Sequence, residues 1–135
     1  MSISLRDYIT ASGRYPERLQ SLELTEEVKQ EAINLLDAVN ALLAKIGITA
    51  VTVSSGFRPS SVNAKIKGAA TKSMHTLGRA VDLADADGAI AAKIQANPAE
   101  LARFGLWLED PASTKGWVHL DNKIRSARAV NIFKP

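Results

Sequence analysis

The longest regular pattern of apolar positions lies between Thr25 and Gly47. Thr25 is a good N-cap residue, and the two glutamates that follow it suit the positive end of a helix dipole. Apolar residues then recur with a period of about 3.6 positions, as on one side of an α-helix. These residues are Val28, Ala32, Leu35, Leu36, Val39, Leu42, Leu43 and Ile46. The pattern predicts a long amphipathic helix that ends at Gly47 and forms the spine of the core.

Shorter runs of β-branched and other apolar residues predict strands. The runs are residues 48–54, 80–84, 106–109 and 117–121, with a closing strand in the tail around Val130, Ile132 and Phe133. In the second strand, Val81 and Leu83 face one side and Asp82 faces the other. In the fourth strand, the apolar residues face one side, while His119 and Asp121 share the opposite side.

The remaining segments predict an N-terminal arm and an irregular connection. Residues 1–24 contain one short helix at residues 5–9, and the arm is expected to pack on the body. The packing residues would be Leu5, Tyr8, Ile9, Leu19 and Leu22. Residues 59–74 predict an irregular connection, with a helical turn near residues 61–65 and a flexible loop at residues 67–72.

Two further helices are predicted after the second strand. Asp85 or Asp87 would cap a helix over residues 89–95. Asn97 would cap the next helix, with proline in its first turn and Glu100 three positions after the cap. Helices mixed with antiparallel hairpins predict an α+β fold, with a small antiparallel sheet packed against helices in a single domain of residues 1–135.

Composition narrows the classes of function. The chain has 135 residues, a formal net charge of +3 and no cysteine. Any metal must therefore be held by His, Asp or Glu. Aromatic residues are few and not interleaved with basic ones, which argues against nucleic-acid binding, and no run reaches membrane-spanning length. The charged N-terminus does not fit a signal peptide, so we expect the chain to be cytoplasmic as synthesised. We also expect a monomer.

The only two histidines suggest a metal site. His75 lies seven positions before Asp82, and His119 lies in the predicted fourth strand. Two imidazoles and a carboxylate are a usual ligand set for a catalytic zinc ion that keeps one position open. Gly78 would let the backbone turn between His75 and Asp82. On spacing alone, ordinary surface or core histidines remain the alternative.

Three segments of the chain carry a resemblance to a known family. They are Ser54-Ser55-Gly56-Phe57-Arg58-Pro59, then Ser73-Met74-His75 with Gly78, Ala80 and Asp82, and finally Trp117-Val118-His119. In this order they resemble the D-alanyl-D-alanine carboxypeptidase-like zinc peptidases, which include phage L-alanyl-D-glutamate endolysins. The resemblance implies one zinc ion held by His75, Asp82 and His119. It also implies that Arg58 grips a substrate carbonyl or carboxylate and stabilises the oxyanion, and that Ser73 hydrogen-bonds the substrate or the site loop. We expect Asn63 to orient the same loop.

The chain departs from the family at the general base. Many members have a glutamate three residues before the last ligand or a histidine two before it, and these positions are Gly116 and Trp117 here. Asp121, on the side of the strand that carries His119, and Glu109, at the end of the partner strand, are the two replacements. Strand geometry favours Asp121, although it would equally suit a carboxylate that orients a zinc-ligating histidine.

The resemblance implies a zinc peptidase that cuts peptidoglycan stem peptides. The short chain is similar to phage or prophage lysis enzymes, which reach the cell wall after release by a holin or from a virion. The alternative is a module on the same scaffold that binds zinc and cell wall without cutting, or a phage structural protein.

Overall fold

A computed structural model describes residues 2–66 and 73–135 of the chain, so the predicted flexible loop at residues 67–72 lies outside the described residues. Within them, one sheet of five strands has the order β1-β2-β4-β3-β5. The strands are β1 (Val53–Ser55), β2 (Ala80–Asp85), β3 (Trp107–Glu109), β4 (Gly116–Asp121) and β5 (Ile132–Phe133). Neighbouring strands are antiparallel except β3 and β5, which are parallel. The predicted α+β class is confirmed.

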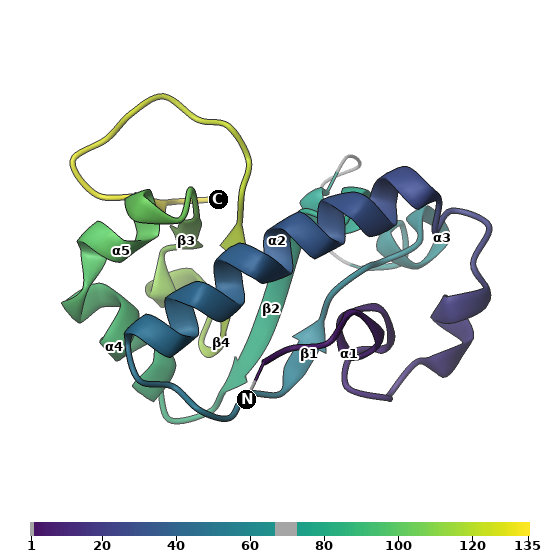
Figure 1. Ribbon diagram of the computed structural model, residues 1–135, viewed down its shortest axis with the longest axis horizontal. Coiled ribbons are helices and arrows are strands. Elements are labelled where there is room, and N and C mark those ends of the chain that lie inside the picture. Colours follow the sequence, from purple (N-terminus) through teal and green to yellow (C-terminus); the bar gives the residue numbers. More distant parts are fainter. Residues whose placement is uncertain (1, 67–72) are drawn as a thin grey trace.

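Helices surround this sheet. The α-helices are α1 (Leu5–Thr10), α2 (Glu26–Lys45), α3 (Ser60–Asn63), α4 (Ala89–Ala96) and α5 (Pro98–Arg103). The part of the chain that the structure describes also has three short 3-10 helices, η1 (Pro16–Gln20), η2 (Met74–Leu77) and η3 (Pro111–Ser113). Figure 1 shows α2 running diagonally across the sheet, with α4, α5 and β3 towards one end and α1 and α3 towards the other.

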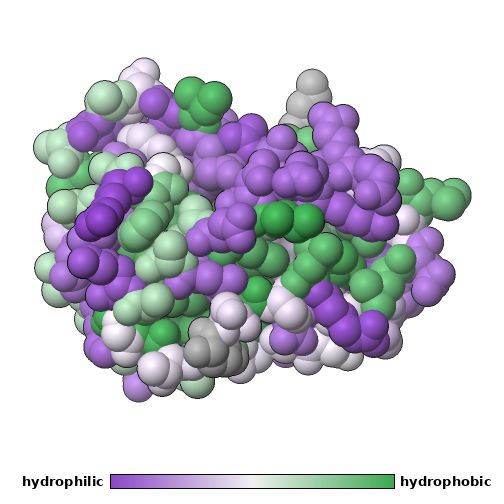
Figure 2. Space-filling view, viewed as in Figure 1, coloured by the Kyte–Doolittle hydropathy of each residue, from purple (hydrophilic) through white to green (hydrophobic). Residues whose placement is uncertain are grey.

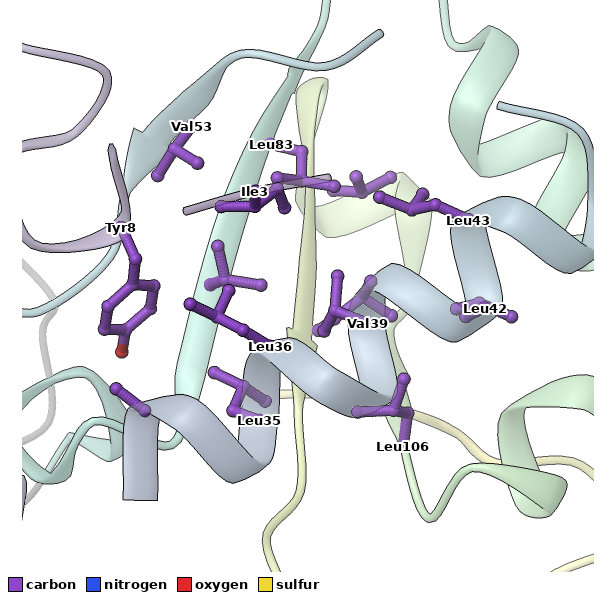
Figure 3. Close-up of a cluster of buried hydrophobic side chains, with 14 of the residues drawn as sticks. Ile3, Tyr8, Leu35, Leu36, Val39, Leu42, Leu43, Val53, Leu83 and Leu106 are labelled. Atoms are coloured by element: carbon purple, nitrogen blue, oxygen red, sulfur yellow. The ribbon is translucent and has the colours of Figure 1, made fainter. Parts of the chain in front are cut away.

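The predicted spine of the core is α2. The Thr25 hydroxyl caps the helix by accepting a hydrogen bond from the Val28 amide at 3.2 Å. Its apolar side is buried from Ala32 onwards, while Val28 is only partly buried. Figure 3 shows side chains of α2, among them Leu36 and Val39, meeting residues of the sheet and of the N-terminal segment. The opposite, hydrophilic side of the helix faces solvent (Figure 2).

The N-terminal arm packs on the body through most of the predicted residues. Tyr8 and Ile9 are buried, and Leu5 and Leu19 pack against the core. Leu22 is 98% exposed, so its predicted packing role was wrong. The Tyr8 hydroxyl donates a hydrogen bond to the Ala80 carbonyl at 2.8 Å, which anchors α1 to the start of β2.

Two predicted segments differ in detail. The strand expected at residues 48–54 is reduced to β1 at Val53–Ser55, since the residues before it form no ladder beyond a hydrogen bond from the Ala84 amide to the Thr52 carbonyl. In the tail, the predicted closing strand exists as β5, and Leu108 of β3 pairs with Ile132.

The caps of the two later helices also differ from the prediction. Gly88 occupies the N-cap of α4, while the Asp85 carboxylate accepts hydrogen bonds from the amides of Ile90 and Ala91. Asp87 accepts one from the Ala89 amide. Asn97 occupies the N-cap position of α5 as predicted, but its side chain makes no capping hydrogen bond and its amide group donates backwards to the Lys93 carbonyl.

Candidate metal centre

The two histidines and Asp82 meet on the side of the sheet opposite α2. His75 comes from η2, Asp82 from β2 and His119 from β4, where His119 is the direct cross-strand partner of Asp82. Directly opposed residues of an antiparallel pair point to the same side of the sheet. One ligand atom from each of the three residues lies within 4.8 Å of the others.

Local sequence explains how His75 reaches Asp82. Ser73 caps η2, since its hydroxyl accepts a hydrogen bond from the His75 amide at 3.2 Å. Gly78 ends the turn with a φ of 74°, a left-handed conformation that favours glycine. A Cβ at Gly78 would also lie 2.6 Å from the Val28 carbonyl oxygen. Gly78 therefore ends η2 and reverses the backbone so that β2 begins two residues later.

Each imidazole has one nitrogen towards Asp82 and one towards an orienting acceptor. His75 Nδ1 lies 2.8 Å from the Gly56 carbonyl oxygen, and its Nε2 lies 3.2 Å from Asp82 Oδ2. His119 Nε2 lies 2.8 Å from Asp121 Oδ2, and its Nδ1 lies 2.9 Å from Asp82 Oδ1. When the nitrogen that faces the orienting acceptor carries the proton, the other ring nitrogen, towards Asp82, has a free lone pair. This is the arrangement found in zinc-ligating histidines.

The donor set fits zinc. Two imidazole nitrogens and one carboxylate are typical of catalytic zinc sites. The two rings lie 3.2 Å and 2.9 Å from different oxygens of Asp82, and one ligand atom from each of the three residues lies within 4.8 Å of the others, so the group is compact enough to hold one metal ion. The carboxylate of Asp82 is 13% exposed, so the group is held inside the protein but open to solvent.

Asp121 lies on the same side of β4 as His119, but both of its carboxylate oxygens already accept hydrogen bonds within the protein. Its Oδ1 accepts hydrogen bonds from Arg125 at 2.6 Å and from the Lys123 amide at 3.1 Å. Its Oδ2 accepts from Arg125 at 3.1 Å, in addition to its contact with His119. Asp121 is 1% exposed. The carboxylate therefore orients His119 and is itself held by a bidentate arginine.

Glu109 lies beside His119 on the neighbouring strand. Trp107 and Leu108 of β3 pair with Asp121 and Leu120, where the ladder ends; continuing this register by one residue would set Glu109 opposite His119, and the charge of His119 acts on Glu109. Glu109 is only half-buried, in contrast to Asp121. On its other side, Glu109 pairs with Phe133.

Phe133 and Arg125 close this edge of the centre. The Phe133 ring stands edge-on to His119, with ring centroids 5.9 Å apart. The Arg125 guanidinium carbon lies 3.7 Å from the Phe133 ring centroid and 5.4 Å from that of Trp107. Sequence reasoning missed both residues as parts of the site. A basic residue four positions after Asp121 in an irregular tail gives no recognisable signal.

Arg58 is a further basic residue near Asp82. Its Nη2 lies 3.9 Å from Asp82 Oδ2 and donates to the Ser55 hydroxyl, while Nη1 donates to Asn63 Oδ1 at 3.0 Å. The Arg58 amide donates to the His75 carbonyl at 3.1 Å, which ties the segment around Arg58 to η2. The structure therefore brings together Arg58, Ser73 and the three ligand residues, as well as both candidate bases.

The electrostatics of the centre follow from these contacts. Burial would raise the pKa of Asp82, but the charge and hydrogen bonds of the two histidines hold it well below its usual range. Burial would likewise raise the pKa of Asp121, but hydrogen bonds from His119 and Arg125 lower it to about 2. Burial would lower the pKa of His119, but its bonds to the two aspartates raise it to about 9.

The pKa of Glu109 shifts in the opposite direction to the pKa values of Asp82 and Asp121. Burial raises its pKa above the ordinary value, and the charge of His119 only partly opposes this shift. The negative charges of Asp82 and Asp121 add to the increase. These influences also place Glu109 within electrostatic reach of the whole cluster. A carboxylate with a raised pKa is a stronger proton acceptor than Asp121, whose pKa is held at about 2 by His119 and Arg125.

Comparison with known proteins gives one match. A family model described as Peptidase M15 matches residues 17–121, which include all three metal-binding candidates. No curated protein and no solved structure matches the chain. No helix among the described residues is long and apolar enough to cross a membrane.

Proposed function

The chain belongs to the Peptidase M15 family, and from this premise we propose that it is a zinc-dependent peptidase that hydrolyses amide bonds in peptidoglycan stem peptides. The observation that carries the proposal is the convergence of His75, Asp82 and His119, with ligand atoms within 4.8 Å of one another. A zinc ion bound there would act as a Lewis acid that polarises the scissile carbonyl and lowers the pKa of a water molecule.

We assign general acid–base chemistry to Glu109. Its position beside His119, its partial burial and its raised pKa suit a group that accepts a proton from the attacking water and passes it to the leaving amine. Asp121 is a positioning residue in this assignment, because the protein already fills its acceptor sites with His119, Arg125 and the Lys123 amide.

Arg58 is the proposed stabiliser of negative charge on the substrate carbonyl oxygen. Its guanidinium is held by Asn63 and Ser55; burial lowers its pKa from a very high ordinary value, and arginine remains charged in proteins. A preorganised cation of this kind is worth more in the transition state than in the ground state, since the oxygen gains charge during the reaction. Ser73 positions His75 through the cap of η2, and its proposed contact with substrate is secondary to that role.

The test is cleavage of purified peptidoglycan by the zinc-loaded protein, with released fragments identified by mass spectrometry. We expect new amino termini in the stem peptide for the wild-type chain and none for Glu109→Gln at unchanged zinc content. Glu27→Gln, at an exposed position on α2, is the matched control and should cleave normally. Binding to peptidoglycan without any cleavage would favour the non-catalytic module instead.

The phage or prophage origin and the route to the cell wall remain predictions from the family resemblance. They are tested by expression in a bacterial host with and without a co-expressed holin. Lysis that depends on both the holin and an intact Glu109 would support a lysis enzyme. Lysis by neither combination would favour a role carried by a virion.

A further inference from the structure

The segment that follows β4 is fastened to the body of the protein at both ends. At its start, the Arg79 guanidinium donates to the side-chain and backbone oxygens of Asn122 at 2.8 and 2.7 Å. At its end, β5 pairs with β3, and the Asp110 amide donates to the Phe133 carbonyl at 2.7 Å. Figure 1 shows the part between these two attachments as a wide irregular loop. We call residues 122–133 the C-terminal strap.

Arg125 joins the strap to the metal centre. Its Nη1 donates to Asp121 Oδ1 at 2.6 Å, and its Nη2 donates to Asp121 Oδ2 at 3.1 Å. Oδ2 is also the oxygen that lies 2.8 Å from His119 Nε2. The same carboxylate oxygen therefore contacts both the arginine of the strap and a metal-binding histidine.

The bidentate pair fixes the plane of the Asp121 carboxylate. The last torsion of an aspartate side chain has a broad preference, so the chain alone does not set the direction of the two oxygens. The Lys123 amide donates to Oδ1 at 3.1 Å and restrains that oxygen only. Two parallel bonds from a guanidinium fork hold both oxygens at once. The direction in which Oδ2 faces the His119 ring therefore depends on Arg125.

Two aromatic rings hold Arg125 itself in place. Its guanidinium carbon lies 3.7 Å from the centroid of the Phe133 ring and 5.4 Å from that of Trp107. The Arg125 side chain is only 17% exposed. Arg128, in the same strap, lies 6.0 Å from the Trp107 ring but is exposed, and its guanidinium donates to the Ile132 carbonyl at 3.4 Å. Arg125 is therefore the arginine of the strap that is fixed against Asp121.

We propose that Arg125 is a positioning residue for metal binding, which acts on zinc through Asp121 and His119. This inference rests on the proposed zinc-dependent function and adds a residue to its site. Arg125 lies beyond residues 17–121, so the family match assigns it no role. Its charge and its positioning act in opposite directions. A guanidinium repels a nearby zinc ion, so charge alone predicts tighter zinc binding when Arg125 is removed. Positioning predicts weaker binding.

Zinc affinity of the full chain, measured by competition with a chromogenic chelator, separates the two effects. Arg125→Gln should bind zinc about tenfold more weakly, at the lower end of the range for groups that orient a metal ligand. Arg125→Lys keeps the charge but lacks the fork, so it should recover only part of the affinity. It also serves as the test should Arg125→Gln fail to fold. Arg128→Gln is the matched control and should bind zinc as the wild type does.

A double-mutant cycle tests whether Arg125 acts through Asp121. An asparagine at position 121 offers one oxygen to the fork, so Arg125 has no carboxylate left to orient. In the Asp121→Asn protein, Arg125→Gln should therefore change zinc affinity by no more than about twofold, the usual scatter for independent changes. A strap that only supports the fold would give the same tenfold loss in both backgrounds.

The outcomes also distinguish this role from the peptidase. Zinc affinity that is unchanged or tighter in both Arg125→Gln and Arg125→Lys would overturn the role of Arg125, whether or not the wild type cleaves peptidoglycan. An undiminished loss in the Asp121→Asn background would overturn it as well. The expected losses in a wild-type chain that binds zinc but cleaves nothing would support the role of Arg125 and contradict the peptidase.

Discussion

Nε2 of His119 lies 2.8 Å from Oδ2 of Asp121, two residues further along the same strand. Because β4 turns alternate side chains to one side, this spacing brings the carboxylate directly behind the imidazole. The other ring nitrogen then faces Asp82 at 2.9 Å. Asp121 therefore fixes which nitrogen of His119 is free to bind a metal.

Replacement of Asp121 should weaken metal binding more than it affects proton transfer. We expect Asp121→Asn to lower zinc affinity about 10–100-fold, the usual effect of removing a carboxylate behind a ligating histidine. At saturating zinc, most cleavage should return. Competition with a chromogenic chelator measures the affinity, and Asp37→Asn at an exposed position on α2 is the control. Loss of cleavage at unchanged zinc affinity would instead make Asp121 the base.

Replacement of Glu109 should affect proton transfer and leave metal binding unchanged. Glu109→Gln should bind zinc normally and lose about 10²–10⁴-fold in kcat, the usual contribution of a general base. Because burial raises the pKa of Glu109 and only its ionised form accepts a proton, wild-type kcat/KM should rise with pH through that raised pKa. A pH profile measures this rise, and an unchanged acid limb in the residual activity of Glu109→Gln would contradict the assignment.

Without a bound metal, the free energy of unfolding should decrease both at low pH and at high pH. The lowered pKa values of Asp82 and Asp121 stabilise the fold above the unfolded value of about 3.9, and this contribution is lost as pH falls towards 2. The pKa of His119, raised to about 9, stabilises the fold below about 6.5, and this contribution is lost as pH rises towards 9. Stability should therefore be greatest near pH 5–6.

Urea unfolding of chelator-treated protein across this pH range measures both limbs. His119→Gln has no proton to lose and should lack the alkaline limb. Zinc affinity should show the reverse trend and increase with pH from 6 to 9, since the metal must displace the His119 proton. A wild-type stability that stays constant between pH 6.5 and 9 would contradict the hydrogen-bonding arrangement around His119.

The Tyr8 hydroxyl should contribute to stability but not to chemistry. It is fully buried and donates to the Ala80 carbonyl at the start of β2. Tyr8→Phe leaves that carbonyl without this donor and should lower the free energy of unfolding by about 1–3 kcal/mol. Tyr15→Phe, at a half-exposed position, should change it little. Equal stability of the two variants, or a loss of zinc affinity in Tyr8→Phe alone, would contradict this role.

Local patterns predicted the parts of the fold that depend on local sequence. The period of apolar residues located α2, and the alternation in residues 80–84 and 117–121 located β2 and β4 with Asp82 and His119 on a shared side. Residues 48–54 were predicted as a strand because β-branched residues favour strands, yet a partner ladder forms only at Val53–Ser55. Propensity alone does not supply that partner.

In the site, too, the parts that depend on local sequence could be predicted and the parts that depend on distant contacts could not. The metal-binding candidates stand in short segments with recognisable spacing, whereas the roles of Glu109 and Asp121 depend on contacts between distant residues. The register of β3 against β4 directs Glu109 towards His119, and Arg125 from the C-terminal tail hydrogen-bonds Asp121.

The central claim is that His75, Asp82 and His119 together hold the zinc ion on which hydrolysis depends. Elemental analysis of protein reconstituted with zinc and freed of excess metal tests it most directly. The account predicts stoichiometric zinc in the wild-type chain and almost none in His75→Ala, Asp82→Ala or His119→Ala, with cleavage lost in the same variants. A wild-type chain that retains no zinc, or an Asp82→Ala variant that retains it fully, would contradict the account.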